Sequence, residues 1–161
     1  MHRWAPYLLV LLLLCQAAGQ ELRVTRLNEG YLRDDVGLFD REERKVITDL
    51  LQEQSQKPLG RIYLDILEKL PSDLTIEQYA RKRLNDSFRI PTDKSDKIMI
   101  VVVLKDRAVR IETSRDVWPK LPDEYCHQVN REVMIPKFKT GAYFAGLKVG
   151  IEALMEKLNA P

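Results

Sequence analysis

An uninterrupted apolar run over residues 98–104 is the feature that most constrains the fold of this chain. The run consists mainly of β-branched residues and, at seven residues, is too short for an ordinary helix. Such a run is typical of a central strand that is covered on both faces. Covering both faces of one sheet requires helices in two layers.

The segments on either side of this run predict a mixed sheet. Residues 61–67 alternate as a strand does, and a helix is expected over 75–87, before 98–104. This order indicates a right-handed parallel crossover between the two strands. After a turn at 105–107, alternation over 109–113 predicts a hairpin whose second strand lies nearer the edge of the sheet.

Two helix starts are marked by capping boxes. Asp40 followed by Glu43 predicts the start of a helix over 41–56. Thr75 followed by Gln78 predicts the start of the crossover helix.

Helical spacing also predicts two helices near the C-terminus. One begins after Pro122 and ends near Pro136, and the other follows Gly141. Residues 40–161 are therefore expected to form one domain, a three-layer α/β/α sandwich with a small mixed sheet. Residues 21–39 have no sustained period and are expected to be an irregular lead-in that pairs briefly as a strand.

Residues 1–20 have the pattern of a secretory signal peptide. One basic residue, Arg3, precedes an apolar run over 7–15, and small and polar residues follow at 16–20. The apolar run is shorter than the roughly 20 residues that span a bilayer. We expect a secreted or periplasmic protein without a transmembrane segment in its mature chain, unless the signal is retained as an anchor.

Charge and motif content exclude several functions. Lys and Arg number 26 against 24 Asp and Glu, with the signs interspersed, which argues against nucleic acid as a partner. The chain has no glycine-rich phosphate loop, no HExxH, no CxxC and no GxSxG, so no catalytic residue is assigned. Cys126 is the one cysteine after residue 20 and is expected to be a buried small hydrophobe. His127 beside it would point elsewhere on a helix, so the two make a poor catalytic couple.

Four aspartates are expected to converge at one end of the sheet, where they could bind calcium or another hard cation through carboxylate oxygens. They are Asp93, Asp96, Asp116 and Asp123. Alternatively, neighbouring cations such as Lys97 and Arg115 neutralise these carboxylates, and Asp123 serves as a helix N-cap.

Trp118 lies between Val117 and Pro119 in a predicted loop. One interpretation is an exposed aromatic that binds a protein partner, because tryptophan is enriched at interaction hot spots. The other is a core residue that covers the end of the sheet.

The order of short motifs resembles the TPM domain, a family named for thylakoid-lumen, photosystem-repair and nematode receptor-modulating members. The resemblance covers about residues 35–158. It is carried by Asp35-Val36-Gly37-Leu38, Ile76-Glu77-Gln78-Tyr79-Ala80, Arg110-Ile111-Glu112, Leu121-Pro122-Asp123, Ile135-Pro136-Lys137-Phe138 and Gly141-Ala142-Tyr143-Phe144-Ala145-Gly146-Leu147. It implies a three-layer α/β/α domain and, for some members, calcium binding and weak acid-phosphatase activity.

The chain departs from the family pattern at two places, which marks it as a divergent member. Asp96-Lys97 stands where members commonly have Asn-Gly, and the segment Ser114 to Trp118 stands where they have Gly-x-Gly-x-Glu. Without these glycines, the backbone approaches a bound ion or phosphate less easily.

Two functions follow as expectations. The first is an exported, non-enzymatic accessory module that binds envelope or membrane proteins during their assembly or maintenance. The second is a metal-dependent weak acid phosphatase, with calcium as the possible cofactor and Arg115 or Lys97 steadying the phosphate.

Overall fold

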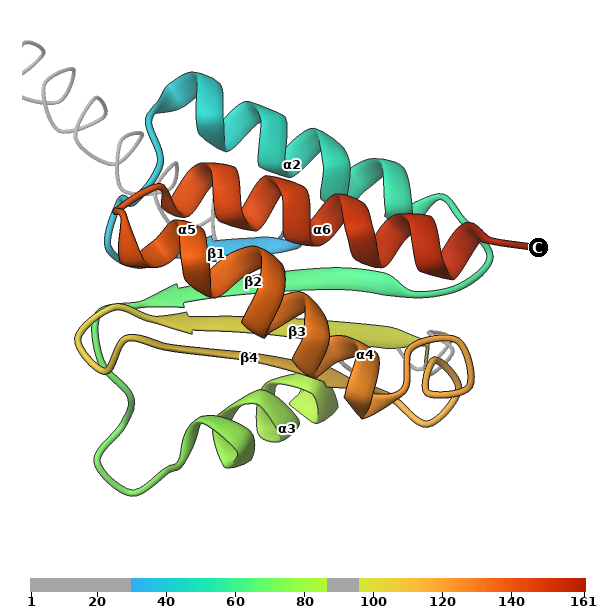
Figure 1. The fold of residues 1–161 in the computed structure, drawn as a ribbon. Coiled ribbons are helices and arrows are strands. Elements are labelled where there is room, and N and C mark those ends of the chain that lie inside the picture. The colour runs from blue at the N-terminus through green and yellow to red at the C-terminus, as the bar shows by residue number, and fades with distance from the viewer. Residues whose placement is uncertain (1–29, 87–95) are drawn as a thin grey trace, which may run out of the picture. The chain divides into compact units, whose positions relative to one another are not determined.

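The sheet has four strands in the order β1-β2-β3-β4 (Figure 1). The structure is a computed structural model, and the residues that it describes are 30–86 and 96–161. The strands are β1 (Leu32–Asp34), β2 (Arg61–Leu67), β3 (Lys97–Val103) and β4 (Ala108–Thr113). β1 pairs with β2 and β2 with β3 in parallel, whereas β3 and β4 form an antiparallel hairpin. The mixed sheet, the parallel pairing of β2 with β3 and the place of β4 at an edge are confirmed.

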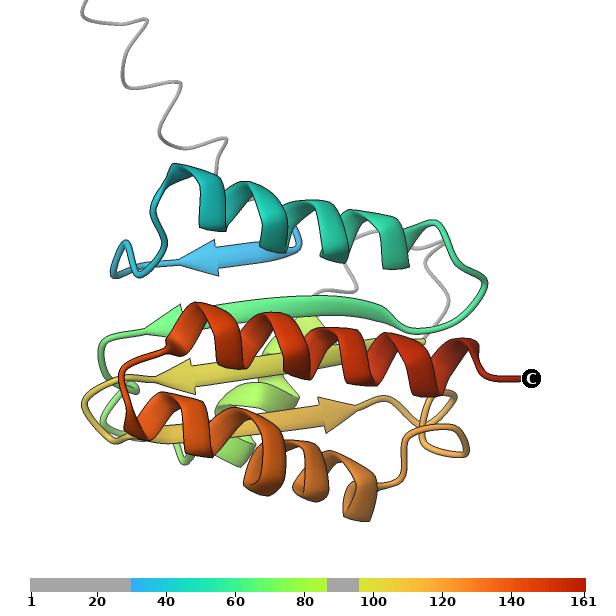
Figure 2. The same cartoon turned by 45° about the horizontal axis from the view of Figure 1, so that its top comes forward.

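All seven residues of β3 are buried, because the sheet is covered on both faces. Alternate side chains enter two cores: Ile98, Ile100 and Val102 join the larger one, and Met99 and Val101 join the smaller one. Figures 1 and 2 show α3 (Ile76–Asp86) on one face, and α2 (Arg41–Ser55) and α6 (Tyr143–Asn159) on the other. The predicted three-layer α/β/α sandwich is confirmed.

Both predicted capping boxes are present. The Asp40 carboxylate accepts a hydrogen bond of 2.8 Å from the Glu43 N–H, and Glu43 accepts one of 3.2 Å from the Asp40 N–H. The Thr75 N–H donates to Gln78 at 2.9 Å, and the Gln78 N–H donates to the Thr75 hydroxyl at 3.3 Å. These bonds satisfy N–H groups that a helix start leaves without intrahelical partners.

The helix after Pro122 does not end near Pro136, so that prediction is wrong. Three segments follow one another, α4 (Asp123–Gln128), the π-helical η2 (Val129–Met134) and α5 (Ile135–Lys139). Pro136 lies in the first turn of α5, a position that tolerates proline although it has no N–H to donate. The π segment, which has i→i+5 bonds, allows the chain to start this new α-helical segment without a loop.

Two further findings concern the N-terminal half and membrane insertion. The segment 21–39, predicted to be an irregular lead-in that pairs briefly as a strand, contains the three-residue strand β1. Its Leu32 and Phe39 are buried in the larger core. The predictions on residues 1–20 and on Asp93 lie outside the described residues.

Within the described ranges, no helix has the length and apolar character needed to cross a membrane.

Candidate functional site

The candidate site lies where β2 and β3 begin and β4 ends. The backbone N–H of Lys97 donates to the Ser114 hydroxyl at 2.9 Å, and the Ser114 N–H donates to the Lys97 carbonyl at 2.9 Å. The Arg61 N–H donates to the Asp96 carbonyl at 2.9 Å. The start of β3 and the segment after β4 therefore lie side by side, as the predicted hairpin required.

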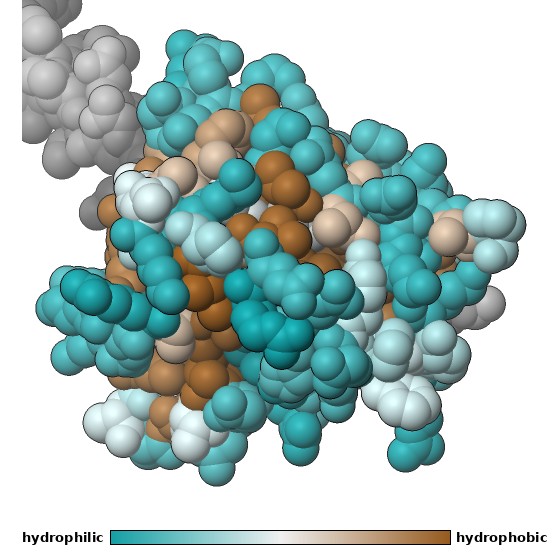
Figure 3. All heavy atoms as spheres, viewed as in Figure 1, coloured by the Kyte–Doolittle hydropathy of each residue, from teal (hydrophilic) through white to brown (hydrophobic). Residues whose placement is uncertain are grey.

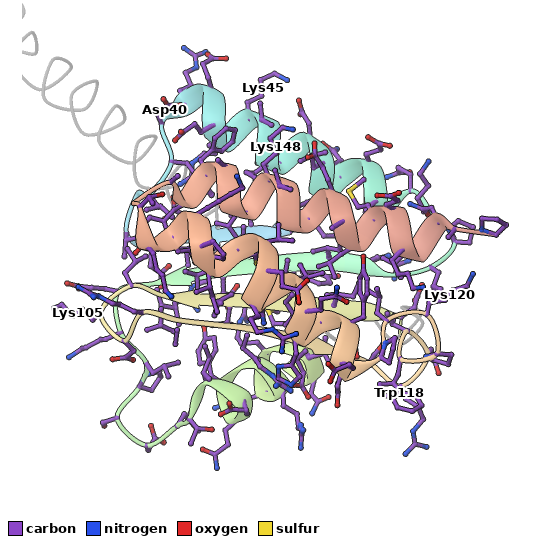
Figure 4. All side chains as sticks on the ribbon, in the orientation of Figure 1. Asp40, Lys45, Lys105, Trp118, Lys120 and Lys148 are labelled. Carbon is purple, nitrogen blue, oxygen red and sulfur yellow. The ribbon has the colours of Figure 1, made fainter. Side chains whose placement is uncertain are left out.

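Trp118 projects from the segment that follows Ser114, and its exposed fraction is 54% (Figure 4). The interpretation of Trp118 as a core residue is therefore wrong. The residues that cover this end of the sheet are Val117 and Leu121, which are both fully buried.

The segment from Ser114 to Leu121, named here the Trp118 turn, is held by many hydrogen bonds. The Val117 and Trp118 N–H groups both donate to the Ser114 carbonyl at 3.1 Å. The Leu121 N–H donates to the Val117 carbonyl at 3.0 Å. The Lys120 ammonium donates to the Ala160 carbonyl at 2.8 Å, which ties the turn to the C-terminus. The exposed indole thus stands on a well-anchored backbone.

Asp96 is the most buried of the described candidate metal ligands. Its Oδ2 atom accepts a hydrogen bond of 3.3 Å from the Gly60 N–H. Its Oδ1 atom is buried, accepts no hydrogen bond from a described residue, and lies 4.0 Å from Nη1 of Arg61. The side chain of neighbouring Lys97 is also buried, and burial together with Arg61 lowers its pKa, while Asp96 opposes this shift. The carboxylate therefore has cationic groups near it.

The other predicted ligands among the described residues are exposed. Asp116 lies exposed in the Trp118 turn, next to the exposed Arg115. Asp123 is the first residue of α4 and is exposed, and the N-cap of that helix is Pro122, so the interpretation of Asp123 as the cap is wrong. Across residues 30–86 and 96–161, no three Asp, Glu, His or Cys side chains are grouped so that they could hold a metal ion.

These described residues do not by themselves fit a calcium ion, which takes six to eight oxygen ligands. Among the residues that the structure describes, Asp96 faces a guanidinium and a backbone N–H and not a further carboxylate. Because Asp93 lies outside the described residues, the four-aspartate site stays a prediction.

Cys126 is buried, as expected, and its Sγ lies 4.0 Å from the Leu121 carbonyl oxygen. Burial, with the nearby charge of Asp123, raises the pKa of its thiol to about 12. His127 is exposed on α4. The thiol is therefore protonated at neutral pH and is no nucleophile there.

Sequence reasoning missed a hollow of about 330 Å³ at the opposite end of the sheet, beside the β3–β4 turn. Arg107 in this turn has φ +49°, in the left-handed region that glycine and asparagine favour. The absence of glycine and asparagine from the turn sequence over 104–107 is the signal that could have marked this place.

Comparison with solved structures shows that the fold is shared with two bacterial proteins. The N-terminal domain of a protein from P. gingivalis has a TM-score of 0.72 at 24% identity, over 80% of this chain and 82% of that chain. The BA42 protein from the psychrophilic bacterium Bizionia argentinensis has a TM-score of 0.60 at 18% identity, over 78% of this chain and 84% of that chain. Comparison with curated proteins finds no match.

Comparison with known protein families gives a match over most of the chain. Residues 32–157 match the TPM domain, from the first strand to the last turn of α6. The earlier resemblance is thereby confirmed, and the chain belongs to the TPM domain family.

Proposed function

We propose that this protein is an exported, non-enzymatic accessory module that binds another protein through the Trp118 turn. The observation that carries the proposal is the exposure of Trp118, 54% of the residue, while Val117 and Leu121 of the same turn are fully buried. A large aromatic on an ordered backbone loses little conformational freedom when it is buried by a partner. Tryptophan in such a position is a common anchor of protein interfaces.

The partner class rests on the pattern of residues 1–20. A signal peptide would deliver the domain outside the cytoplasm, where envelope proteins and the exposed parts of membrane proteins are available to it. N-terminal sequencing of the protein recovered from its expressing cells tests this step, and we expect a mature end near residue 21. An intact Met1 on all of the protein would contradict cleavage.

The binding step is tested with a tryptophan variant and a matched control. The full chain with an affinity tag is expressed in its own cells, and proteins bound to it are cross-linked, isolated and identified. Trp118→Ala should reduce recovery of the specific partner about tenfold or more. Truncation of a hot-spot tryptophan costs about 2 kcal/mol or more of binding free energy, which corresponds to more than a tenfold loss of affinity.

Val149→Ala is the control, because Val149 is the other large apolar residue exposed in the described chain, at 40%, and lies on α6. This variant should retain the partner. Trp118→Ala should also keep its melting temperature within a few degrees of the original, since the indole is largely outside the core. Equal partner recovery with Trp118→Ala and with the original chain would overturn the proposal.

A metal-dependent phosphatase is the second candidate, and one observation favours it. The Asp96 Oδ1 atom is buried without a hydrogen-bond donor among the described residues, and a buried acceptor of this kind is unusual. An assay of the purified protein with a generic phosphate ester, with and without calcium, distinguishes the two functions. Under the binding proposal, the rate does not exceed that of an Asp96→Asn/Asp116→Asn double variant. A calcium-dependent rate that this double variant loses would establish the enzyme instead.

A further inference from the structure

We propose that the hollow between the β3–β4 turn and α5 binds a small organic carboxylate whose body is an apolar chain or ring. The hollow lies at the opposite end of the sheet from the Trp118 turn. The inference therefore does not depend on the proposed protein-binding function.

The size and the lining of the hollow suit a small apolar body. Its volume of about 330 Å³ is in the range of small-molecule pockets. Its walls include Val102, Ala108 and Ile135, together with the rings of Phe138 and Tyr143, which are stacked with their centroids 4.9 Å apart. Figure 3 shows hydrophobic side chains reaching the surface on this side of the molecule, between hydrophilic ones.

The charged groups at the hollow are both cations. Arg107 comes from the β3–β4 turn and Lys139 from the end of α5, and no acidic residue within 30–86 or 96–161 lines the hollow. Neither side chain forms an ion pair within the part of the chain that the structure describes. Lys105, two residues before Arg107, is paired instead with Glu68 at 2.9 Å. Two cations without an internal counter-charge beside an apolar hollow are complementary to a carboxylate on an apolar body.

The backbone at Arg107 is an independent sign of a function here. Its φ of +49° is costly for a side chain with a Cβ, and glycine would be more stable in the same conformation. Strained conformations of this kind concentrate at binding and catalytic sites. The hollow also lies where the parallel strand β3 ends at Val103, which is the end of the strands at which open α/β sheets bind ligands.

The test is a titration of the purified full chain followed by two-dimensional amide NMR. Octanoate is the probe, and octanol is its uncharged match of similar length. Octanoate at millimolar concentration should shift amide signals within residues 102–108 and 135–143. Octanol at the same concentration should shift them much less, because it offers no charge to Arg107 and Lys139.

Three variants sharpen the test. Arg107→Gly and Lys139→Gln should each weaken octanoate binding about tenfold, the change expected when a charge-assisted hydrogen bond is lost. Arg107→Gly also relieves the backbone strain, so its melting temperature should not fall, and loss of binding cannot then be due to unfolding. Lys105→Gln is the control, because it removes a cation of the same turn that is already paired, and it should bind as before.

Several results would overturn the proposal. One is octanol binding as tightly as octanoate, which would mark the hollow as an apolar surface without selectivity for an anion. Another is unchanged octanoate affinity in an Arg107→Gly/Lys139→Gln double variant. A third is the absence of any shift at these amides over the whole titration.

Discussion

The hydroxyl oxygen of Ser114 accepts a hydrogen bond of 2.9 Å from the backbone N–H of Lys97, and so joins the end of β4 to the start of β3. The Ser114 carbonyl also accepts hydrogen bonds from the N–H groups of Val117 and Trp118. Ser114 therefore holds the Trp118 turn together and also attaches it to the start of β3. The position of the exposed indole therefore depends on a contact between segments 17 residues apart.

Loss of the Ser114 hydroxyl should destabilise the domain. Ser114→Ala leaves the Lys97 N–H without its acceptor, which should lower the free energy of unfolding by about 1 kcal/mol. Urea denaturation followed by circular dichroism measures this change. Ser72→Ala is the control, because Ser72 is exposed in a turn and its loss should change stability by less than about 0.5 kcal/mol. Equal stability of the Ser114→Ala and Ser72→Ala variants would contradict the anchoring role.

The carboxylates of Asp34 and Asp35 should differ strongly in their importance for stability. The Asp34 side chain is fully buried, and it accepts hydrogen bonds from the Leu38 N–H at 3.0 Å and from Arg44 at 2.8 Å. Asp34→Ala should therefore lower the free energy of unfolding by about 2 kcal/mol or more, since buried charge-assisted bonds are lost. Asp35 pairs with Arg33 near the surface, and Asp35→Ala should cost less than about 1 kcal/mol. Denaturant unfolding of the two variants measures the difference, and equal losses would contradict it.

Alanine substitutions at Gly60 and Gly37 should separate the effect of backbone conformation on stability from the effect of packing. Both have positive φ, +80° and +65°, but only at Gly60 would a Cβ meet another group, the Cδ1 atom of Leu158 at 2.7 Å. Gly37→Ala should cost about 1 kcal/mol from backbone strain alone. Gly60→Ala should cost about 1 kcal/mol more, because Leu158 must move within the core. Thermal and urea unfolding measure both changes, and a smaller loss for Gly60→Ala than for Gly37→Ala would show that the core yields freely there.

The Cys126 thiol should be unreactive in the folded protein. Burial raises its pKa from 9.0 to about 12, so folding favours the protonated form. The contribution of the Cys126 thiol to the free energy of unfolding is complete below the pKa that this thiol has in the unfolded chain. It is lost as the pH rises towards 12, the pKa of the thiol in the folded protein. Alkylation of the folded protein by iodoacetamide at pH 8 should be much slower than alkylation of the chain unfolded in urea at the same pH.

The alkaline loss of stability is checked with a variant. The free energy of unfolding should fall less steeply above pH 9 in Cys126→Ala than in the original chain. Tyr79, whose pKa burial raises to about 12, contributes a loss of the same sign, so the variant should keep part of the slope. Rapid alkylation of the folded chain would contradict the burial of the thiol.

Much of the fold could be predicted because it depends on local patterns. The apolar run over 98–104 identified the central strand, since a strand buried on both faces is apolar at nearly every position and forms an unbroken run in the sequence. The capping boxes at Asp40 and Thr75 marked helix starts by bonds made within four residues. The continuation of helical structure past Pro136 to Lys139 could not be predicted, because the π segment before it changes which N–H groups need a partner.

The candidate site could be predicted only in part. The meeting of the Asp96 and Ser114 segments followed from hairpin topology, which the sequence indicated. The neighbours of Asp96 did not follow, because Arg61 begins the parallel strand β2 and Gly60 precedes it, 35 residues or more away in the chain. The hollow beside Arg107 was missed because it is formed jointly by a turn and by α5, which no local pattern connects.

The sequence by itself determined most of the strands and helices, their order and the need for two helical layers, because periodicity and caps reflect the burial and hydrogen bonding of each element. Only the tertiary structure decided that Trp118 is exposed while Val117 and Leu121 are buried, and that Arg107 and Lys139 share one hollow. The physical reason is that the exposure of a loop side chain and the shape of a cavity depend on atoms from distant segments, whose packing is not encoded in any single window of the chain.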